Sequence, residues 1–218
     1  MDIKAKINEV LAALTWRVEH EKGARDLEIT SDPWSRTHTI KMPTAGPDWR
    51  DIEYLHELAH ATLAERHHLL STAYFERGIA QSGIDPLINP IRTASDWFAD
   101  DLLMQWCPHE EAAEIREHAG YILDNLAGFA LQGEVLYGGG LFLAQQVHYR
   151  GVSLCLYQNR DALSWQFRRV VDILLDFDPS RPTVAEKRNL INRLAGLTCK
   201  MRVHITRQDG MDVWRIKK

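Results

Sequence analysis

Apolar residues recur every three or four positions along most of the chain, which predicts a largely helical protein. The first such stretch predicts a helix of about five turns that ends near Gly23. Its apolar positions are Ile3, Ile7, Val10, Leu11, Leu14 and Val18. Leu27 to Thr30 and Thr37 to Met42 instead alternate apolar and polar residues, and Ser31-Asp32-Pro33 between them is typical of a turn. We therefore expect one helix followed by two short strands.

A second helix is predicted from about Asp48 to His68. Gly46-Pro47-Asp48 is a helix-start signal, because it combines a breaker, a proline suited to the first turn and an acid favoured by the helix dipole. Apolar residues then recur at helical spacing at Ile52, Leu55, Ala59 and Leu63. We expect this helix to be buried on that side.

The connection that follows is rich in residues that break helices: Gly78, Gly83, Pro86 and Pro90. Asn89 as N-cap, with Pro90 at the first helical position, predicts that a third helix begins there. Asp96 and Asp100 lie four residues apart on one face of this helix. An apolar stripe runs beside them, formed by Ile91, Ala94, Phe98 and Leu102.

The C-terminal half also follows the helical period. Helices are predicted from His109 to about Leu131, from Glu134 to Tyr149 and from Asp161 to about Phe177. Three glycines, Gly138 to Gly140, either break or kink the middle helix, or admit a ligand or a close helix. Thr183-Val184-Ala185-Glu186 is a capping box that opens a further helix to about Leu197.

The last stretch changes to a period of two. Arg202 to Thr206 and Met211 to Ile216 flank Gln208-Asp209-Gly210, which is a hairpin signal. The expected fold class is therefore α+β. Residues 1–107 hold a helix, a small sheet and two further helices, and residues 108–218 form a mainly helical region with a terminal β-hairpin.

Composition is that of a globular protein. The 218 residues are 45% hydrophobic and 26% charged, and a net charge of −4 gives no electrostatic reason to expect nucleic-acid binding. No apolar run approaches the ~18 residues needed to cross a bilayer, and the amphipathic start differs from a signal peptide. We expect a cytoplasmic protein without membrane contacts, whose oligomeric state the sequence does not indicate. Cys107, Cys155 and Cys199 lack C-x-x-C spacing, which favours reduced thiols.

The candidate chemistry lies in the second predicted helix, where His56-Glu57-Leu58-Ala59-His60 matches H-E-x-x-H. Residues four apart on a helix share a face, so His56 and His60 can bind one metal ion. Neutral imidazole suits Zn²⁺, and a hydrolytic zinc site keeps a position for a water molecule whose pKa falls to about 7. Glu57 is the expected general base.

The motif supplies two metal ligands, and the third must come from elsewhere in the chain. Leu63 and Arg66 stand where a metzincin has glycine and its third histidine, which excludes that class. His67 lies eleven residues past His56, about 16 Å along an unbroken helix. If the helix ended early, His67 or His68 would be able to fold back as in SprT-like proteases. Glu76, sixteen residues past His60, is another candidate.

Asp96-Trp97-Phe98-Ala99-Asp100 resembles the E-x-x-x-D element of thermolysin-like gluzincins, with Asp in place of Glu. In those enzymes the first acid of the element binds zinc and the second orients the first histidine of the motif. The resemblance implies that Asp96 is the third ligand, with Asp100 as the partner of a motif histidine or as an alternative ligand. It also implies a zincin-like metallopeptidase domain over residues 1–107.

Phe98-Ala99-Asp100-Asp101-Leu102-Leu103-Met104 resembles a segment of the ImmA/IrrE-like metallopeptidases, which are intracellular enzymes that cleave repressors of mobile elements. The resemblance covers about residues 25 to 105. The chain departs from that family upstream of the phenylalanine, where Arg92 and Ala94 stand in the region of its acid ligand.

These resemblances imply a zinc-dependent intracellular peptidase that acts on a protein or peptide substrate. In zincins an edge strand beside the cleft pairs with an extended substrate, and a tyrosine or histidine stabilises the oxyanion. Candidates for the latter role are His148, Tyr149, Tyr137 and Tyr157. The alternative is a catalytically silent regulatory or adaptor protein that keeps a zincin-like fold to bind a protein partner.

Overall fold

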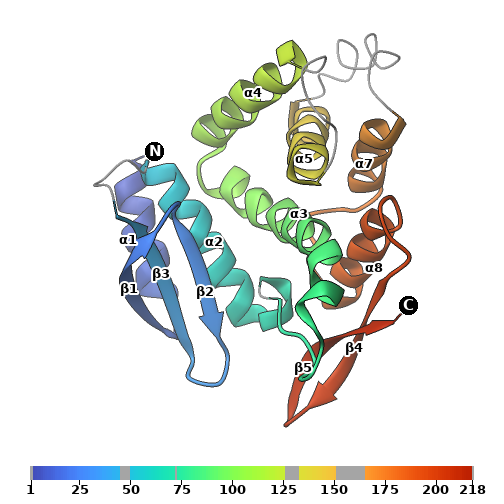
Figure 1. Ribbon diagram of the computed structural model, residues 1–218. Coiled ribbons are helices and arrows are strands. Elements are labelled where there is room, and N and C mark those ends of the chain that lie inside the picture. The colour runs from blue at the N-terminus through green and yellow to red at the C-terminus, as the bar shows by residue number, and fades with distance from the viewer. Residues whose placement is uncertain (1, 45–49, 72, 126–132, 151–164, 218) are drawn as a thin grey trace.

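The computed structural model describes residues 2–44, 50–71, 73–125, 133–150 and 165–217. These residues form an α+β fold with seven α-helices and two small sheets, the second of which is a C-terminal hairpin. Helix α3 (Gln81–Trp106) runs through the centre of the molecule (Figure 1). It packs against α2 (Asp51–Arg66) of the N-terminal half and against helices of the C-terminal half.

The N-terminal sheet holds three strands, β1 (Arg17–Ala24), β2 (Glu28–Asp32) and β3 (Thr37–Pro43), in the order β1-β3-β2. Strand β1 pairs parallel to β3, and β2 pairs antiparallel to it. The two strands predicted from alternation are β2 and β3, and the prediction is confirmed. Strand β2 is an edge of this sheet, and α2 packs against it.

The prediction that the first helix continues to Gly23 is wrong, because α1 (Ile3–Ala13) ends ten residues earlier and β1 follows. The cause is a contact with α2. The Glu65 carboxylate accepts hydrogen bonds from the backbone N–H of Thr15, at 2.8 Å, and of Trp16, at 2.6 Å. These bonds hold the chain in a turn out of the helix, and pairing with β3 then supplies the backbone hydrogen bonds of β1.

Helix α2 carries the H-E-x-x-H motif and is buried along one side, as predicted, by residues such as Leu55, Leu58 and Leu63. The start signal at residues 46–48 lies outside the described residues, and the observed helix begins at Asp51. Arg50 caps it together with Glu53. A short 3-10 helix, η1 (His68–Leu70), follows.

The prediction that the third helix begins at Pro90, with Asn89 as its N-cap, is wrong, since α3 begins at Gln81 and contains both Pro86 and Pro90. A proline in a helix removes a hydrogen bond and costs about 3 kcal/mol in an interior position. Burial of the surrounding apolar side chains offsets that cost, since Leu87 and Ile91 lie in the core beside Pro90.

Helices α4 (Pro108–Asn125), α5 (Gly133–Arg150) and α7 (Trp165–Leu175) confirm the three predicted C-terminal helices within the described residues. The glycines neither break nor end α5. A Cβ atom on Gly139 would lie 2.9 Å from the ring of Phe167, and one on Gly140 would overlap Val170. Of the roles predicted for these glycines, the close approach of a second helix is the one observed.

Helix α8 (Val184–Ala195) is capped by the Thr183 side chain, which accepts from the backbone N–H of Glu186 at 3.1 Å. The predicted hairpin is β4 (Arg202–Gln208) and β5 (Met211–Lys217). Its turn places Asp209 and Gly210 at φ 51° and 84°, as a type I′ turn requires. Within the described ranges no helix has both the length and the apolar character to cross a membrane.

Candidate metal centre

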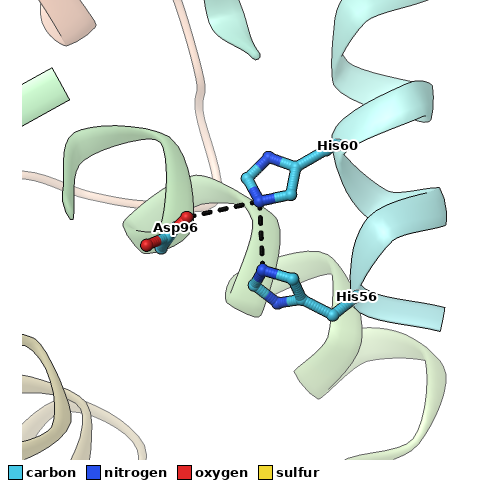
Figure 2. A group of neighbouring side chains, drawn as sticks. All are labelled: His56, His60 and Asp96. Atoms are coloured by element: carbon cyan, nitrogen blue, oxygen red, sulfur yellow. Dashed lines mark hydrogen bonds and ion pairs between the residues drawn. The ribbon is translucent and has the colours of Figure 1, made fainter. Parts of the chain in front are cut away.

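Helices α2 and α3 bring together three side chains of types that can bind a metal ion. Nε2 of His60 lies 3.0 Å from Nε2 of His56 and 3.3 Å from Oδ1 of Asp96 (Figure 2). One donor atom from each of the three side chains lies within 4.8 Å of the other two. The structure therefore brings the motif histidines and Asp96 into one group that can hold a metal ion.

The spacing fits a small divalent cation. Donor atoms about 2.0–2.1 Å from a tetrahedral ion lie about 3.3–3.4 Å from one another. The distances from Nε2 of His60 to Nε2 of His56 and to Oδ1 of Asp96, 3.0 and 3.3 Å, are close to that value. Two nitrogen donors and one carboxylate also leave room for a fourth ligand, as hydrolytic zinc sites require.

Asp100 fixes the orientation of His56. Nδ1–H of His56 donates to Oδ1 of Asp100 across 2.8 Å, which leaves Nε2 directed at His60 (Figure 2). Gln145 of α5 donates to the other oxygen of the same carboxylate. Burial lowers the pKa of His56, but the Asp100 carboxylate, together with the charges of Glu57 and Asp96, raises it to about 10. Asp100 thus contacts His56 and lies outside the group of three donor side chains, which is the position expected of a partner of a candidate ligand.

Glu57 lies beside the histidines on α2 and is held by strand β2. The backbone N–H of Ile29 donates to Oε2 of Glu57 across 2.8 Å. Burial raises the pKa of the Glu57 carboxyl, and the charges of His56 and His60 lower it in part. Because one oxygen is fixed by a main-chain donor, the position of this carboxylate is determined by the sheet as well as by α2.

Two cavities meet at the centre. The first, the β2 pocket, has a volume of about 680 Å³ and is bordered by Glu28 to Ser31 and by Tyr74. The second, the α4 pocket, has a volume of about 540 Å³ and extends toward Glu111. His56, Glu57 and Asp96 line both. The metal-binding group therefore lies in the middle of a cleft that runs from an edge strand to α4.

The other candidate ligands lie elsewhere. Both oxygens of Glu76 accept from Arg215 of the terminal hairpin, at 2.7 and 2.9 Å. His67 contacts Asp212 at 3.2 Å, and Nε2–H of His68 donates to the backbone carbonyl of Asp212 at 2.7 Å. Glu76, His67 and His68 are thus engaged by the hairpin and do not join the metal-binding group.

The candidates for oxyanion stabilisation also have other partners. The Tyr137 hydroxyl donates to the Leu194 carbonyl at 3.1 Å, and the Tyr149 hydroxyl donates to Asp101 at 3.1 Å. His148 packs against Trp97. None of these three lines either pocket, and Tyr157 lies outside the described residues.

Two polar side chains that the sequence did not single out face the cleft. His118 of α4 borders the α4 pocket, and its Nδ1–H donates to the Glu114 carbonyl at 2.9 Å. Tyr74 borders the β2 pocket, and its hydroxyl donates to Asp32 at 3.3 Å. No motif marks either residue, because each reaches the cleft through the packing of its own segment.

A buried lysine supports α3 next to Asp96. Nζ of Lys187, on α8, donates to Oγ of Ser95 and to the Leu70 carbonyl, both at 2.7 Å. Burial lowers the pKa of this fully enclosed ammonium to about 7, although the charge of Asp96 opposes the shift. Lys187 thereby ties α8 and η1 to the turn of α3 that carries the third metal-binding side chain.

Comparison with known proteins gives no relative: no family model, curated protein or solved structure matches the chain. Any function assigned to the metal-binding group therefore depends on its own geometry and chemistry.

Proposed function

We propose that this protein is a zinc-dependent peptidase that hydrolyses protein or peptide substrates in the cleft between β2 and α4. The observation that carries the proposal is the convergence of His56, His60 and Asp96 beside Glu57, at the place where two open pockets meet. A structural metal site usually has four protein ligands and is closed to substrate, whereas this group has three candidate ligands and borders two open pockets.

The donor set favours zinc. Two imidazoles and one carboxylate match the ligands of hydrolytic zinc sites, whereas Mg²⁺ and Ca²⁺ prefer oxygen ligands throughout. The His56–Asp100 pair is a carboxylate–histidine arrangement of the kind that raises the basicity of a zinc ligand. Bound here, zinc would supply Lewis-acid chemistry that polarises a carbonyl and makes water acidic.

Glu57 is assigned the proton transfers. Its carboxylate takes a proton from the attacking water as the water oxygen bonds to the substrate carbonyl carbon. It then passes the proton to the nitrogen of the breaking C–N bond, which leaves as an amine. The hydrogen bond from Ile29 N–H supports this assignment, because it keeps one oxygen fixed and leaves the other for exchange with water.

The backbone geometry of strand β2 favours a peptide as the substrate. Along a strand, N–H and C=O groups point alternately to the two sides. Because Ile29 directs its N–H at Glu57 and not at β3, the same alternation turns the backbone groups of Ser31 toward the β2 pocket. An extended peptide has the donors and acceptors to pair with such an edge.

The test compares wild type with Glu57→Gln, because Gln keeps the shape and can still accept from Ile29. Both proteins are loaded with zinc and incubated with a peptide mixture of diverse sequence, and new termini are counted by mass spectrometry. We expect both to bind one zinc and the variant to cleave about 10²–10⁴-fold more slowly. Chelation should stop cleavage by wild type, and added zinc should restore it.

Equal cleavage by wild type and the Glu57→Gln variant would exclude the assigned role. If the zinc-loaded wild type cleaves nothing but retains a protein partner, the protein is instead the silent regulatory protein considered above.

A further inference from the structure

The α4 pocket combines apolar walls with a buried acid. Its walls are formed by Leu27, Ile52, Leu103, Leu141 and Phe142. Glu111 of α4 lines the same pocket and has a relative exposure of 6%, whereas the side chains of Arg50 and Glu53 are 50% and 40% exposed. Glu111 therefore lies deep in the pocket, and the other two side chains lie at its mouth.

Three other carboxylates of the pocket wall, Asp100, Glu114 and Glu53, already have counter-charges or donors. Asp100 accepts from His56 and from Gln145. Glu114 accepts a hydrogen bond from Arg50 at the mouth of the α4 pocket, and Arg50 also contacts Glu53 at 3.0 Å. The negative charge of each of these groups is already stabilised by a partner within the chain.

Glu111 differs from them. Within the part of the chain that the structure describes, its carboxylate makes no hydrogen bond and no ion pair. Burial, with smaller contributions from the charges of Asp100 and Glu114, raises the pKa of Glu111 to about 8, although the charge of His56 opposes the shift. A buried carboxylate without a partner costs several kcal/mol when ionised, and a cation that enters the pocket removes that cost.

We infer that the α4 pocket selects a substrate with a lysine or arginine side chain next to the cleaved bond, and that Glu111 is the residue that recognises it. This inference rests on the proposed peptidase function. The long aliphatic stem of lysine or arginine would pack on the apolar walls while the charged end meets Glu111. The volume of about 540 Å³ is in the range of ligand pockets, about 300–1,000 Å³.

The position of the pocket indicates that it receives the side chain of a substrate residue next to the cleaved bond. His56, Glu57 and Asp96 line the pocket as well as the cleft centre. A side chain that enters it therefore belongs to a residue close to the carbonyl that reacts. The pocket lies on the α4 side of the centre, and the β2 edge lies on the other side, so an extended peptide can occupy both.

The experiment uses pairs of blocked peptides that differ only in lysine against norleucine, which has a similar length and no charge. Wild-type zinc protein should cleave the lysine peptide with a kcat/KM higher by about tenfold or more. In Glu111→Gln this ratio should fall toward one. The matched control is Glu117→Gln, because Glu117 is exposed on the same helix and does not line the pocket. It should keep the wild-type ratio.

Measurements of peptide binding test this inference independently of whether the protein cleaves peptides. The dissociation constants of the same peptides are measured with zinc-loaded Glu57→Gln, alone and combined with Glu111→Gln. A preference for lysine that disappears with Glu111→Gln supports the pocket assignment even if wild type cleaves nothing. Cleavage without a preference for lysine or arginine overturns the assignment and leaves the peptidase proposal intact. Equal affinities for the two peptides, or a preference that survives Glu111→Gln, also overturn it.

Discussion

Nδ1 of His56 lies 2.8 Å from Oδ1 of Asp100, and this contact joins the two helices that carry the metal-binding group. The carboxylate lies in turn against Gln145 of α5. A candidate metal ligand on α2, His56, is thus oriented by α3, and α3 is supported at that point by the C-terminal half. The site depends on the packing of all three helices.

Asp100→Asn should weaken zinc binding by about 10–100-fold, because the amide no longer stabilises the His56 imidazole as a carboxylate does. Competition with a chromophoric chelator measures the affinity. Asp101→Asn is the matched control, because Asp101 is also buried but accepts from Tyr149 and Gln105. A similar loss in both variants would indicate general loosening of α3 and would contradict the role assigned to Asp100.

Asp96→Ala should reduce zinc affinity by more than about 100-fold, because it removes one of three ligands. Glu76→Ala should leave the affinity unchanged, since the Glu76 carboxylate is held by Arg215. The zinc content of dialysed protein, measured by mass spectrometry of the metal, distinguishes the two variants. Zinc loss in Glu76→Ala together with full zinc in Asp96→Ala would refute the ligand set.

Gly140→Ala should lower the free energy of unfolding by about 1–3 kcal/mol, because its Cβ would overlap Val170 of α7. Gly138→Ala is the internal comparison, since a Cβ there meets no atom within 4 Å. It should raise the free energy of unfolding by up to about 1 kcal/mol through helix propensity. Urea unfolding measures both, and equal stability of the two variants would contradict the close packing of α5 on α7.

His38 should make the fold less stable in mild acid. Its ring is buried, with Nδ1 at 2.7 Å from Oγ of Ser31 and Nε2 at 3.2 Å from Glu65. Burial lowers the pKa of His38 below its usual value of 6.5, although Glu65 opposes the shift. The unfolded chain therefore takes up the proton first, and the stabilisation present above pH 6.5 is lost as the pH falls toward the folded-state pKa.

His38→Gln tests this pH dependence, because Gln can hydrogen-bond but does not titrate. Between about pH 7.5 and pH 5.5 the free energy of unfolding of wild type should fall more than that of the variant. A chelator is present throughout, so that loss of zinc does not contribute. Glu65 has a lowered pKa and titrates below this range. If the free energies of unfolding of the two proteins changed in parallel with pH, His38 would not contribute to the pH dependence of stability.

The part of the site that is local in sequence was predictable. His56 and His60 share a helix face because they are four residues apart, and this needs no tertiary information. Asp96 is different, since thirty-six residues separate it from His60 and only the docking of α3 on α2 brings the two together. Its place beside the two histidines was expected from a resemblance, and the structure brings it there.

Gln145, Glu111 and His118 reach the site from helices of the C-terminal half, and no pattern in the sequence marks them. Hydrophobic periodicity gives the buried side of each helix but not the helix that it faces. The early end of α1 was missed for the same reason: Leu14 and Val18 continue the helical spacing, and the group that ends the helix is a carboxylate fifty residues away, on Glu65.

The most direct test of the metal centre is zinc X-ray absorption on the full-length protein after zinc loading and dialysis. We expect one zinc per chain, with two imidazole nitrogens and otherwise oxygen as ligands, and loss of one imidazole in His60→Ala. Absence of stoichiometric zinc, or a sulfur ligand in place of the imidazoles, would contradict it.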